Sequence, residues 1–256
     1  GLGNMGQPMA VNLRQAGYEL TVHDIEPNRA RPLIDLGASW AESIAQGMAQ
    51  ADVVICSLPG PVQVEQVVLG EAGIAAHIRA GMTLIDTSTS SVELARKIHH
   101  ILHSKQAGYL ESPITNAADG AKAGLLSIFV AGDAALYTQH LPIYQVLGKK
   151  IFHVGAPGNA ATVKLLTNLL WFVSAATIGE ALMLGAKAGV PLETVWHAIQ
   201  ASAGNSCSLV FTSGVPVRQA SGQRTIGVVT TQAVSAALAS AGDSAFGAGP
   251  SGAVVT

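Results

Sequence analysis

The sequence of 256 residues is poor in charge and in cysteine. Lys, Arg, Asp and Glu make up 12% of it, and the formal net charge is −2. A protein that binds nucleic acid or an anionic membrane through its charge needs a clear basic excess, so we expect neither partner. Cys56 and Cys207 lie far apart and match no metal-ligand spacing. This excludes a disulfide framework and indicates a reducing compartment, which we take to be the cytoplasm.

An uninterrupted apolar segment is also missing. Residues 165–184 are strongly apolar, but five polar residues lie among them: Thr167, Asn168, Ser174, Thr177 and Glu180. A membrane-spanning helix rarely tolerates that set, so we expect a buried helix of a soluble protein. No secretory or transit segment can be recognised, although a truncated start would hide one. Apolar residues make up 49% of the sequence, which allows a large core in one large domain or two smaller ones.

The first six residues, Gly1-Leu2-Gly3-Asn4-Met5-Gly6, form a G-x-G-x-x-G motif, and Asp24 follows 18 residues after Gly6. Glycines in this pattern let the backbone turn tightly and approach a pyrophosphate, which the next helix faces with its N-terminal N–H groups. A carboxylate at about this spacing binds ribose hydroxyls. Two simpler interpretations stay open: the glycines open an ordinary helix, and Asp24 is a helix cap or a loop acid.

The residues between the motif and the acid favour a dinucleotide site. Apolar residues at helical spacing over 9–13 predict a helix that ends at Gly17, and residues 18–24 predict a strand that ends on the acid. Glycine loop, helix, strand and acid follow one another in the order that a mononucleotide-binding half requires. The negative charge of Asp24 would repel a 2′-phosphate, so we expect NAD, whereas Arg29 and Arg31 leave NADP open.

A dinucleotide-binding fold needs a strand before its first glycine, and the printed sequence begins at that glycine. Without this strand, the two strands that flank the central position would each lose a partner. Two interpretations stay open: the sequence is a fragment, or the fold is damaged at its centre.

Strands and helices alternate up to residue 154. We expect strands over 53–58, 82–86, from 109 to an interruption at Pro113, 127–131 and 150–154, and helices over 29–36, 43–50, 62–69 and 91–104. This order predicts an α/β fold, a Rossmann-type doubly wound parallel sheet in residues 1–156. The pattern then changes: long helices over 160–187 and 192–201 predict an all-helical second domain in residues 157–256, for substrate binding and dimerisation.

The composition changes again at Cys207. Only Arg218, Arg224 and Asp243 are charged in the last fifty residues, and no helical stripe of large apolar residues is visible. We therefore expect an incomplete helical domain. One hypothesis is that residues 207–256 are foreign to the fold, as a shifted reading frame would make them, and disordered. The alternative is a loosely packed segment of small residues.

Four stretches resemble the β-hydroxyacid dehydrogenase family, which includes 3-hydroxyisobutyrate dehydrogenase, tartronate semialdehyde reductase and their 6-phosphogluconate relatives. In chain order they are residues 1–10, the Ile85-Asp86-Thr87-Ser88-Thr89 stretch, the Glu111-Ser112-Pro113-Ile114-Thr115-Asn116-Ala117 stretch with Gly120 and Gly124, and residues 155–158 followed by Lys164 and Asn168. The resemblance extends from Gly1 to about Ser206. It implies reversible hydride transfer between a β-hydroxy acid and NAD.

The resemblance implies that Lys164 is the proton donor and acceptor at the carbinol oxygen, with Asn168 one helical turn on to orient it. An ordinary lysine is a poor base near neutral pH, but apolar neighbours and an adjacent oxidised nicotinamide both favour the neutral amine. On spacing alone, a solvated surface lysine is the simpler interpretation.

The sequence departs from the family at the substrate loop, where members typically have Ser-Gly-Gly and this chain has Thr115, Asn116 and Ala117. Thr115 keeps a hydroxyl group for the substrate carboxylate. Asn116 and Ala117 carry β-carbons, so a positive-φ glycine geometry becomes costly or must change. We expect these three residues to bind the substrate in a pocket of different shape.

Other residues are assigned to the cofactor. Asn4 and Met5 belong to the glycine loop, whereas Leu58, Pro59 and Thr89 follow strands at the carboxyl edge of the sheet, where such ligands lie. Simple loop turning is the alternative for the last three. His99, His100 and His103 lack a third-ligand pattern and a carboxylate, so we expect solvated helix residues and no metal site.

Two other functions stay open. A catalytically inactive NAD-binding scaffold is one, because the family's later helical region supplies a lysine-containing segment near the cofactor and the dimer contacts, and none follows Ser206 here. An imine-type reductase on the same fold is the other, and Lys164 argues against it. The expected partner is a small-molecule β-hydroxy acid, with a homo-oligomer if the helical domain is intact.

Overall fold

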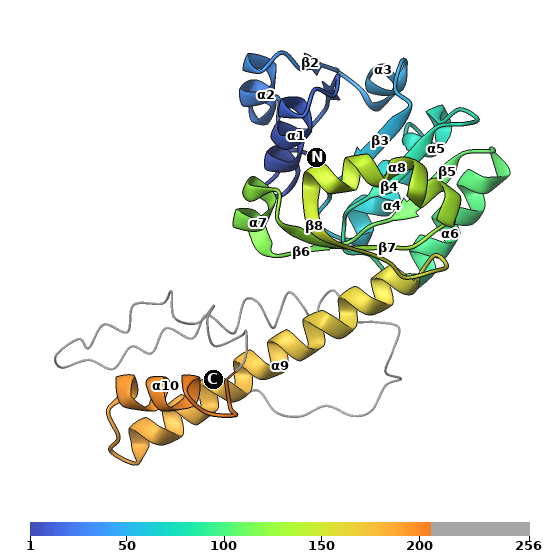
Figure 1. The fold of residues 1–256 in the computed structure, drawn as a ribbon. Coiled ribbons are helices and arrows are strands. Elements are labelled where there is room, and N and C mark those ends of the chain that lie inside the picture. The colour runs from blue at the N-terminus through green and yellow to red at the C-terminus, as the bar shows by residue number, and fades with distance from the viewer. Residues whose placement is uncertain (206–256) are drawn as a thin grey trace. The chain divides into compact units, whose positions relative to one another are not determined.

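The computed structural model describes residues 1–205 (Figure 1). The chain divides into two compact units, Gly1–Leu165 and Leu166–Thr256. Residues 206–256 lie outside the described residues. The two hypotheses for residues 207–256, a foreign disordered segment and a loosely packed one, therefore fall outside them too.

The first unit contains short strands separated by helices. Its strands are β1 (Thr21–Val22), β2 (Ser39–Trp40), β3 (Val53–Cys56), β4 (Thr83–Asp86), β5 (Gly108–Glu111), β6 (Ile114–Thr115), β7 (Leu126–Val130) and β8 (Gly148–His153). Its helices are α1 (Gly6–Gln15), a 3₁₀ turn (Pro27–Ala30), α2 (Arg31–Asp35), α3 (Ile44–Met48), α4 (Pro61–Leu69), α5 (Ile74–His77), α6 (Val92–Ser104), α7 (Ala117–Ala123) and α8 (Ala134–Leu147). Helix α9 (Asn159–Lys187) begins in this unit and continues into the second, and α10 (Leu192–Gln200) follows it.

The strands form three hydrogen-bonded groups: β1-β2, β3-β4-β5 and β6-β7-β8. The first two groups are parallel, as expected, and the register of the second aligns Cys56, Asp86 and Glu111 at its carboxyl edge. The third group differs, because β6 pairs with β7 in the antiparallel direction. Pro113 lies between β5 and β6, and its fixed φ and missing N–H favour a break in the strand there.

The β1-β2 and β3-β4-β5 groups are not hydrogen-bonded to each other within the described residues. The first residues of the chain lie at the carboxyl ends of both groups: Leu2 contacts Asp24, which follows β1, and a β-carbon built on Gly1 would lie 2.6 Å from the carbonyl oxygen of Ser57, which follows β3. This is the place where the sequence analysis expects a preceding strand.

Both faces of the β3-β4-β5 group are covered by apolar side chains, which is what a doubly wound sheet requires. Leu84 and Tyr109 belong to one core cluster, which contains residues of α4, α5 and α6. Their chain neighbours Ile85 and Leu110 belong to a second cluster, which contains residues of α1, α7 and α8. Successive residues of a strand point to opposite faces, so the sheet lies between two helical layers.

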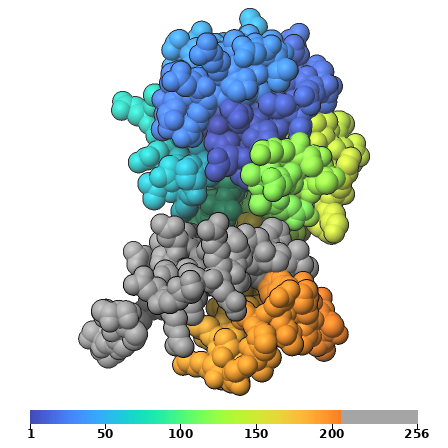
Figure 2. Space-filling model, turned by 90° about the vertical axis from the view of Figure 1, so that its left-hand side faces the viewer, coloured from blue at the N-terminus to red at the C-terminus, as the bar shows by residue number. Residues whose placement is uncertain are grey.

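Helices α1 and α7 lie side by side on one face of the first unit, where Figures 1 and 2 show the dark-blue α1 next to the green α7. The side-chain amide of Asn12 donates a hydrogen bond of 2.8 Å to the carbonyl oxygen of Ala121. Because α1 begins at the glycine loop and α7 begins at the expected substrate loop, this contact fixes the two loops relative to each other.

In the second unit, α9 and α10 approach closely where α9 has a glycine. A β-carbon built on Gly185 would lie 2.7 Å from a methyl group of Val195, so a larger residue there would push the helices apart. The expectation of a buried helix over 165–184 is wrong for the described residues, since Leu169, Leu170 and Leu184 are more than half exposed. By length and composition α9 could cross a membrane, but the polar residues within it argue against that.

Candidate active site

The glycine loop has the geometry of a phosphate-binding turn. Gly6 is the first residue of α1, and a β-carbon built on it would collide with the carbonyl oxygen of Gly1. Gly3 is different, because the nearest atom to a β-carbon built on it is Nη1 of Arg29 at 3.7 Å. The backbone at Gly3 can therefore be approached closely, and the loop fits the pyrophosphate of a dinucleotide in front of the N-terminus of α1.

Asp24 holds this loop against the end of β1. One carboxylate oxygen accepts a hydrogen bond from the N–H of Leu2 at 2.6 Å, and the other accepts one from the N–H of Glu26 at 2.9 Å. Burial favours the neutral acid, but these two N–H groups and the positive charge of Arg29 hold the pKa of Asp24 below its usual value. Asp24 is therefore ionised near neutral pH and has a structural role that the sequence analysis did not foresee.

Arg29 lies beside Gly3, and its side chain is held by Glu26, three residues earlier in the chain. Its guanidinium donates to both carboxylate oxygens of Glu26, at 2.7 and 3.0 Å. Its carbonyl oxygen accepts a hydrogen bond of 2.8 Å from the side chain of Gln7 in α1. A cation is thus fixed next to the glycine loop, close to the acid that is expected to bind ribose.

The loops that follow β3 and β4 are joined by Ser88. Its hydroxyl accepts a hydrogen bond of 2.9 Å from the N–H of Leu58, and its own N–H donates to Asp86 at 3.0 Å. Burial raises the pKa of Asp86 to about 6, although the hydrogen bonds from Ser88 oppose this. The structure thereby brings together the loop of Leu58 and Pro59 and the loop that contains Thr89. No individual role for Asp86 or Ser88 was expected from the sequence, although both lie in the polar run at the end of a buried strand.

The loop between β6 and α7 keeps a glycine-like backbone without glycines. Asn116 has φ +91° and Ala117 has φ +53°, both in the left-handed region. The side-chain nitrogen of Asn116 donates to the carbonyl oxygen of Leu125 at 2.9 Å and to the hydroxyl of Ser127 at 3.2 Å. Of the two outcomes that the sequence allowed, the costly geometry is the one present, and the hydrogen bonds of Asn116 support it.

Lys164 lies near the start of α9 and is buried, with 9% of its surface exposed. Burial lowers the pKa of its amine from the ordinary lysine value. Asn168 follows one turn later on the same helix, in the second unit. The first turn of α9 is held by Glu111, whose two carboxylate oxygens accept hydrogen bonds from the N–H groups of Gly158 and Ala161 at 2.7 and 2.8 Å. No role for Glu111 was expected from the sequence.

Comparison with known protein families assigns most of the chain. Residues 1–155 match the family described as the NAD binding domain of 6-phosphogluconate dehydrogenase, and residues 158–230 match the family described as the NAD-binding domain of NADP-dependent 3-hydroxyisobutyrate dehydrogenase. The chain belongs to the β-hydroxyacid dehydrogenase family. The second match continues past Ser206, where the resemblance was expected to end.

Individual relatives and solved structures can be compared with this chain. The chain is 36% identical over 209 residues to 3-hydroxyisobutyrate dehydrogenase of Pseudomonas aeruginosa, covering 82% of this chain and 70% of the relative. A solved structure of Mycobacterium tuberculosis 3-hydroxyisobutyrate dehydrogenase with L-serine has TM-score 0.75 and 32% identity, covering 81% of this chain and 70% of that one. A variant imine reductase of Myxococcus stipitatus in complex with NAD⁺ has TM-score 0.70 and 26% identity, covering 78% and 68%. The expected family, fold class and nicotinamide cofactor are confirmed, and the chain is an oxidoreductase of the NAD(P)-dependent kind.

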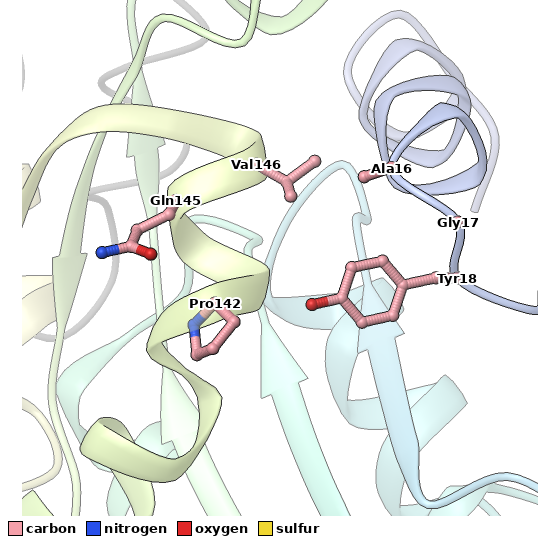
Figure 3. Close-up of a pocket in the computed structure, with 6 residues that line it drawn as sticks. All are labelled: Ala16, Gly17, Tyr18, Pro142, Gln145 and Val146. Carbon is pink, nitrogen blue, oxygen red and sulfur yellow. The ribbon is translucent and has the colours of Figure 1, made fainter.

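A surface hollow of about 370 Å³ lies away from the glycine loop. Figure 3 shows the ring of Tyr18 extending across it from the end of α1 toward Pro142 of α8. The ten residues of α1 separate the hollow from the glycine loop, about 15 Å along the helix axis. Ligands of open α/β sheets bind at the carboxyl ends of the strands, so we do not assign the hollow to the cofactor.

Within residues 1–205, no group of three or more His, Cys, Asp or Glu side chains is arranged to hold a metal ion. The rings of His99 and His103 stack with their centres 5.8 Å apart. Burial lowers the pKa of His99, and the neighbouring His103 and His100 lower it further. These histidines lie on α6 and have no assigned part in the family's chemistry.

Proposed function

We propose that the chain is an NAD-dependent oxidoreductase that transfers a hydride between a β-hydroxy acid and its semialdehyde or keto form, with Lys164 as general acid and base. The observation that carries this proposal is the burial of the Lys164 amine near the start of α9, in the same unit as the glycine loop. A buried lysine without a chemical task is uncommon, because desolvation disfavours its charge.

The nicotinamide supplies the hydride acceptor or donor when it is bound. Lys164 handles the proton that accompanies the hydride. In the oxidative direction its neutral amine accepts the hydroxyl proton, and in the reductive direction its ammonium group donates a proton to the oxygen that becomes the alcohol. A free lysine has a pKa of about 10.4, so the lowering by burial moves the amine toward the range where both roles are efficient. Asn168, one turn on, orients the amine or the substrate.

The proposed cofactor contacts follow from the glycine loop. Gly1, Gly3, Asn4, Met5 and Gly6 surround the pyrophosphate, and ionised Asp24 accepts hydrogen bonds from ribose hydroxyls in addition to those from Leu2 and Glu26. Leu58, Pro59 and Thr89 line the path from the ribose toward the nicotinamide; the link through Ser88 supports this grouping. NAD is the preferred cofactor, and Arg29 leaves room for NADP.

The proposed substrate site is the loop of Thr115, Asn116 and Ala117. The side-chain nitrogen of Asn116 is engaged by Leu125 and Ser127, so the backbone N–H groups and the Thr115 hydroxyl are the groups available to a carboxylate. The β-carbons of Asn116 and Ala117 reduce the space in this loop. A small substrate fits this change, and the names of two relatives mention small β-hydroxy acids, 3-hydroxyisobutyrate and L-serine.

The test is a titration of the purified full chain with NADH and NADPH, followed by turnover measurements on a panel of β-hydroxy acids and their semialdehydes. Lys164→Ala should lower kcat by on the order of 10²–10⁴ while the cofactor Kd stays near that of the parent. The matched control is Lys187→Ala at the far end of α9, which should leave both values unchanged. A parent chain that binds NADH but turns over no substrate would favour the scaffold hypothesis.

An imine reductase activity is the second candidate, because a solved imine reductase shares the fold. The same panel should include a cyclic imine with NADPH. We propose that the family's oligomer forms if the helical unit is complete, and that the enzyme acts in the cytoplasm.

A further inference from the structure

Glu111 is a buried acid to which the proposed chemistry gives no task. It ends β5, and only 3% of its surface is exposed. Its carboxylate forms no ion pair within the described residues. Its partners are backbone N–H groups at the start of α9: those of Gly158 and Ala161, 47 and 50 residues further along the chain, and that of Ala160 between them. Burying a carboxylate is costly, so its place here calls for a physical reason.

The carboxylate closes the N-terminus of the helix that carries Lys164. The first N–H groups of a helix have no partner within the helix, and a negative charge at this end is favourable. A Ser, Thr or Asp within the chain segment itself usually meets this need, as Ser91 does for α6 and Asp133 does for α8. For α9 the acid comes from the sheet, so the cap also joins two elements that are distant in sequence.

The turn before α9 is fixed on its other sides as well. Gly158 has φ +94°, and a β-carbon built on it would lie 2.9 Å from Val92 and 3.0 Å from Arg96 of α6. The carbonyl oxygen of Gly155 accepts a hydrogen bond of 2.8 Å from the N–H of Gly132, just beyond β7. The helix start thus lies against α6 and the strand ends, and the carboxyl group of Glu111 links it to the sheet.

We propose that Glu111 is a positioning residue that sets the place of the Lys164 amine relative to the cofactor loop. Lys164 follows Ala161 by three residues, about one turn of a rigid helix, so a shift of the first turn moves the amine with it. This inference rests on the proposed function of Lys164.

The sheet register places the acid that holds the start of α9 next to the acid that holds the loops after β3 and β4. Asp86 and Glu111 are paired residues on the neighbouring strands β4 and β5, and the N–H of Ser112 donates to the carbonyl oxygen of Asp86 at 2.7 Å. Asp86 holds Ser88 and through it Leu58, on the cofactor side. One pair of adjacent carboxylates therefore organises the cofactor loops and the helix of the lysine.

The experiment compares Glu111→Gln, Glu111→Asp and Asp133→Ala in the full chain. Gln keeps one acceptor oxygen, and its amide group cannot accept the second N–H, so α9 loses half of its cap. We expect kcat to fall on the order of a hundredfold, because a displacement of about 1 Å at a reacting group has that effect. The Kd of NADH should stay within about twofold, and Glu111→Asp, which keeps the charge and both oxygens, should recover part of kcat.

The control Asp133→Ala removes a carboxylate cap from α8 in the same unit and should lower thermal stability without a change in kcat. Amide hydrogen exchange provides a readout that does not depend on turnover: residues 158–164 should exchange faster in Glu111→Gln than in the parent and in Asp133→Ala. If Glu111→Gln does not fold, the same exchange and kinetic measurements on Glu111→Asp decide.

The outcomes separate the two proposals. If Lys164→Ala abolishes turnover but Glu111→Gln keeps kcat within twofold of the parent, the positioning role of Glu111 is wrong and the proposed function stands. If Lys164→Ala retains turnover, the proposed function itself fails. Unchanged exchange at residues 158–164 would also overturn the positioning role.

Discussion

The carboxylate of Asp24 accepts a hydrogen bond from the backbone N–H of Leu2 at 2.6 Å, so the acid at the end of β1 fixes the glycine loop before any cofactor binds. A residue expected to contact ribose thus also preorganises the phosphate site. The N–H of Glu26 donates a second hydrogen bond to the other carboxylate oxygen, so each oxygen of Asp24 holds one backbone group. The loop and the acid should therefore respond together to mutation and to pH.

Asp24→Asn should weaken both the fold and NADH binding. An amide can accept only one of the two hydrogen bonds, so we expect a loss of stability of about 1–3 kcal/mol. The pKa of Asp24 is lowered in the folded chain, so its contribution is present above the unfolded carboxyl value and is lost as the pH falls through the lower folded value. Thermal unfolding from pH 7 to pH 2 should show a steeper acid loss for the parent than for the variant; parallel curves would contradict this.

Ala117→Gly should stabilise the chain. Ala117 has φ +53°, a conformation that costs an L-residue with a β-carbon about 1 kcal/mol and that glycine adopts freely. We expect a gain of about 1 kcal/mol by chemical unfolding. Ala118→Gly, at the next position of α7, is the matched control and should destabilise by about 0.5–1 kcal/mol. A loss of stability in both variants would show that the left-handed geometry at Ala117 carries no strain.

The stability of the Asp86→Asn variant relative to the parent should increase as the pH rises. The pKa of Asp86 is raised to about 6 by burial, so the folded chain holds a proton there that the unfolded chain releases near pH 4. Stability of the parent is therefore lost as the pH rises through this window, on the order of 3 kcal/mol in all. The asparagine has no such dependence and can still accept from Ser88. Between pH 4 and pH 7.5, the unfolding midpoint of the variant minus that of the parent should increase. If this difference stays constant over the range, the pKa of Asp86 is not raised.

Gly6→Ala should remove cofactor binding, because its β-carbon collides with the carbonyl oxygen of Gly1 and the loop must open. The control is Gly47→Ala inside α3, where the new β-carbon would lie 3.4 Å from Ala41 and alanine is the better helix former. Titration of NADH fluorescence should show an affinity loss of at least tenfold for the first variant and none for the second. Unchanged affinity in Gly6→Ala would exclude this loop as the pyrophosphate site.

Most of the sheet could be predicted from the sequence because its strands are short apolar runs that end at turns. The strands expected over 53–58, 82–86 and 127–131 correspond to β3, β4 and β7. The strand expected over 18–24 is only Thr21–Val22, since β1 pairs with the two residues of β2 alone within the described residues. Pairing partners, not propensity, set its length.

Three helices, α5, α7 and α8, were not predicted. Helix α5 is a single turn of four residues, too short to show a periodic pattern. Helix α7 is a short run of small residues with no apolar stripe, and its start depends on the unusual backbone of Asn116. Helix α8 contains Pro142 and only a weak apolar periodicity. Each of these helices is stabilised by packing on the rest of the unit. The residue pattern of a single segment does not reveal such packing.

Some residues of the candidate site could likewise be predicted from the sequence, and others could not. The glycine loop and Asp24 stand out because their expected chemistry is carried by residue type and spacing, whereas Lys164 stands out only through the resemblance to the family. Ser88, Asp86 and Glu111 do not, because their roles depend on hydrogen bonds to residues of other elements; Glu111 reaches Gly158 across 47 positions. Only the folded backbone shows that an acid of β5 caps the helix of the lysine.

Gly185 of α9 lies so close to Val195 of α10 that a β-carbon built on it would be 2.7 Å from a methyl group. Alanine is the better helix former, but at this position its side chain would have no space between the two helices. The second unit of Gly185→Ala should consequently melt at a lower temperature than that of the parent, as followed by circular dichroism, despite the higher helix propensity of the new residue.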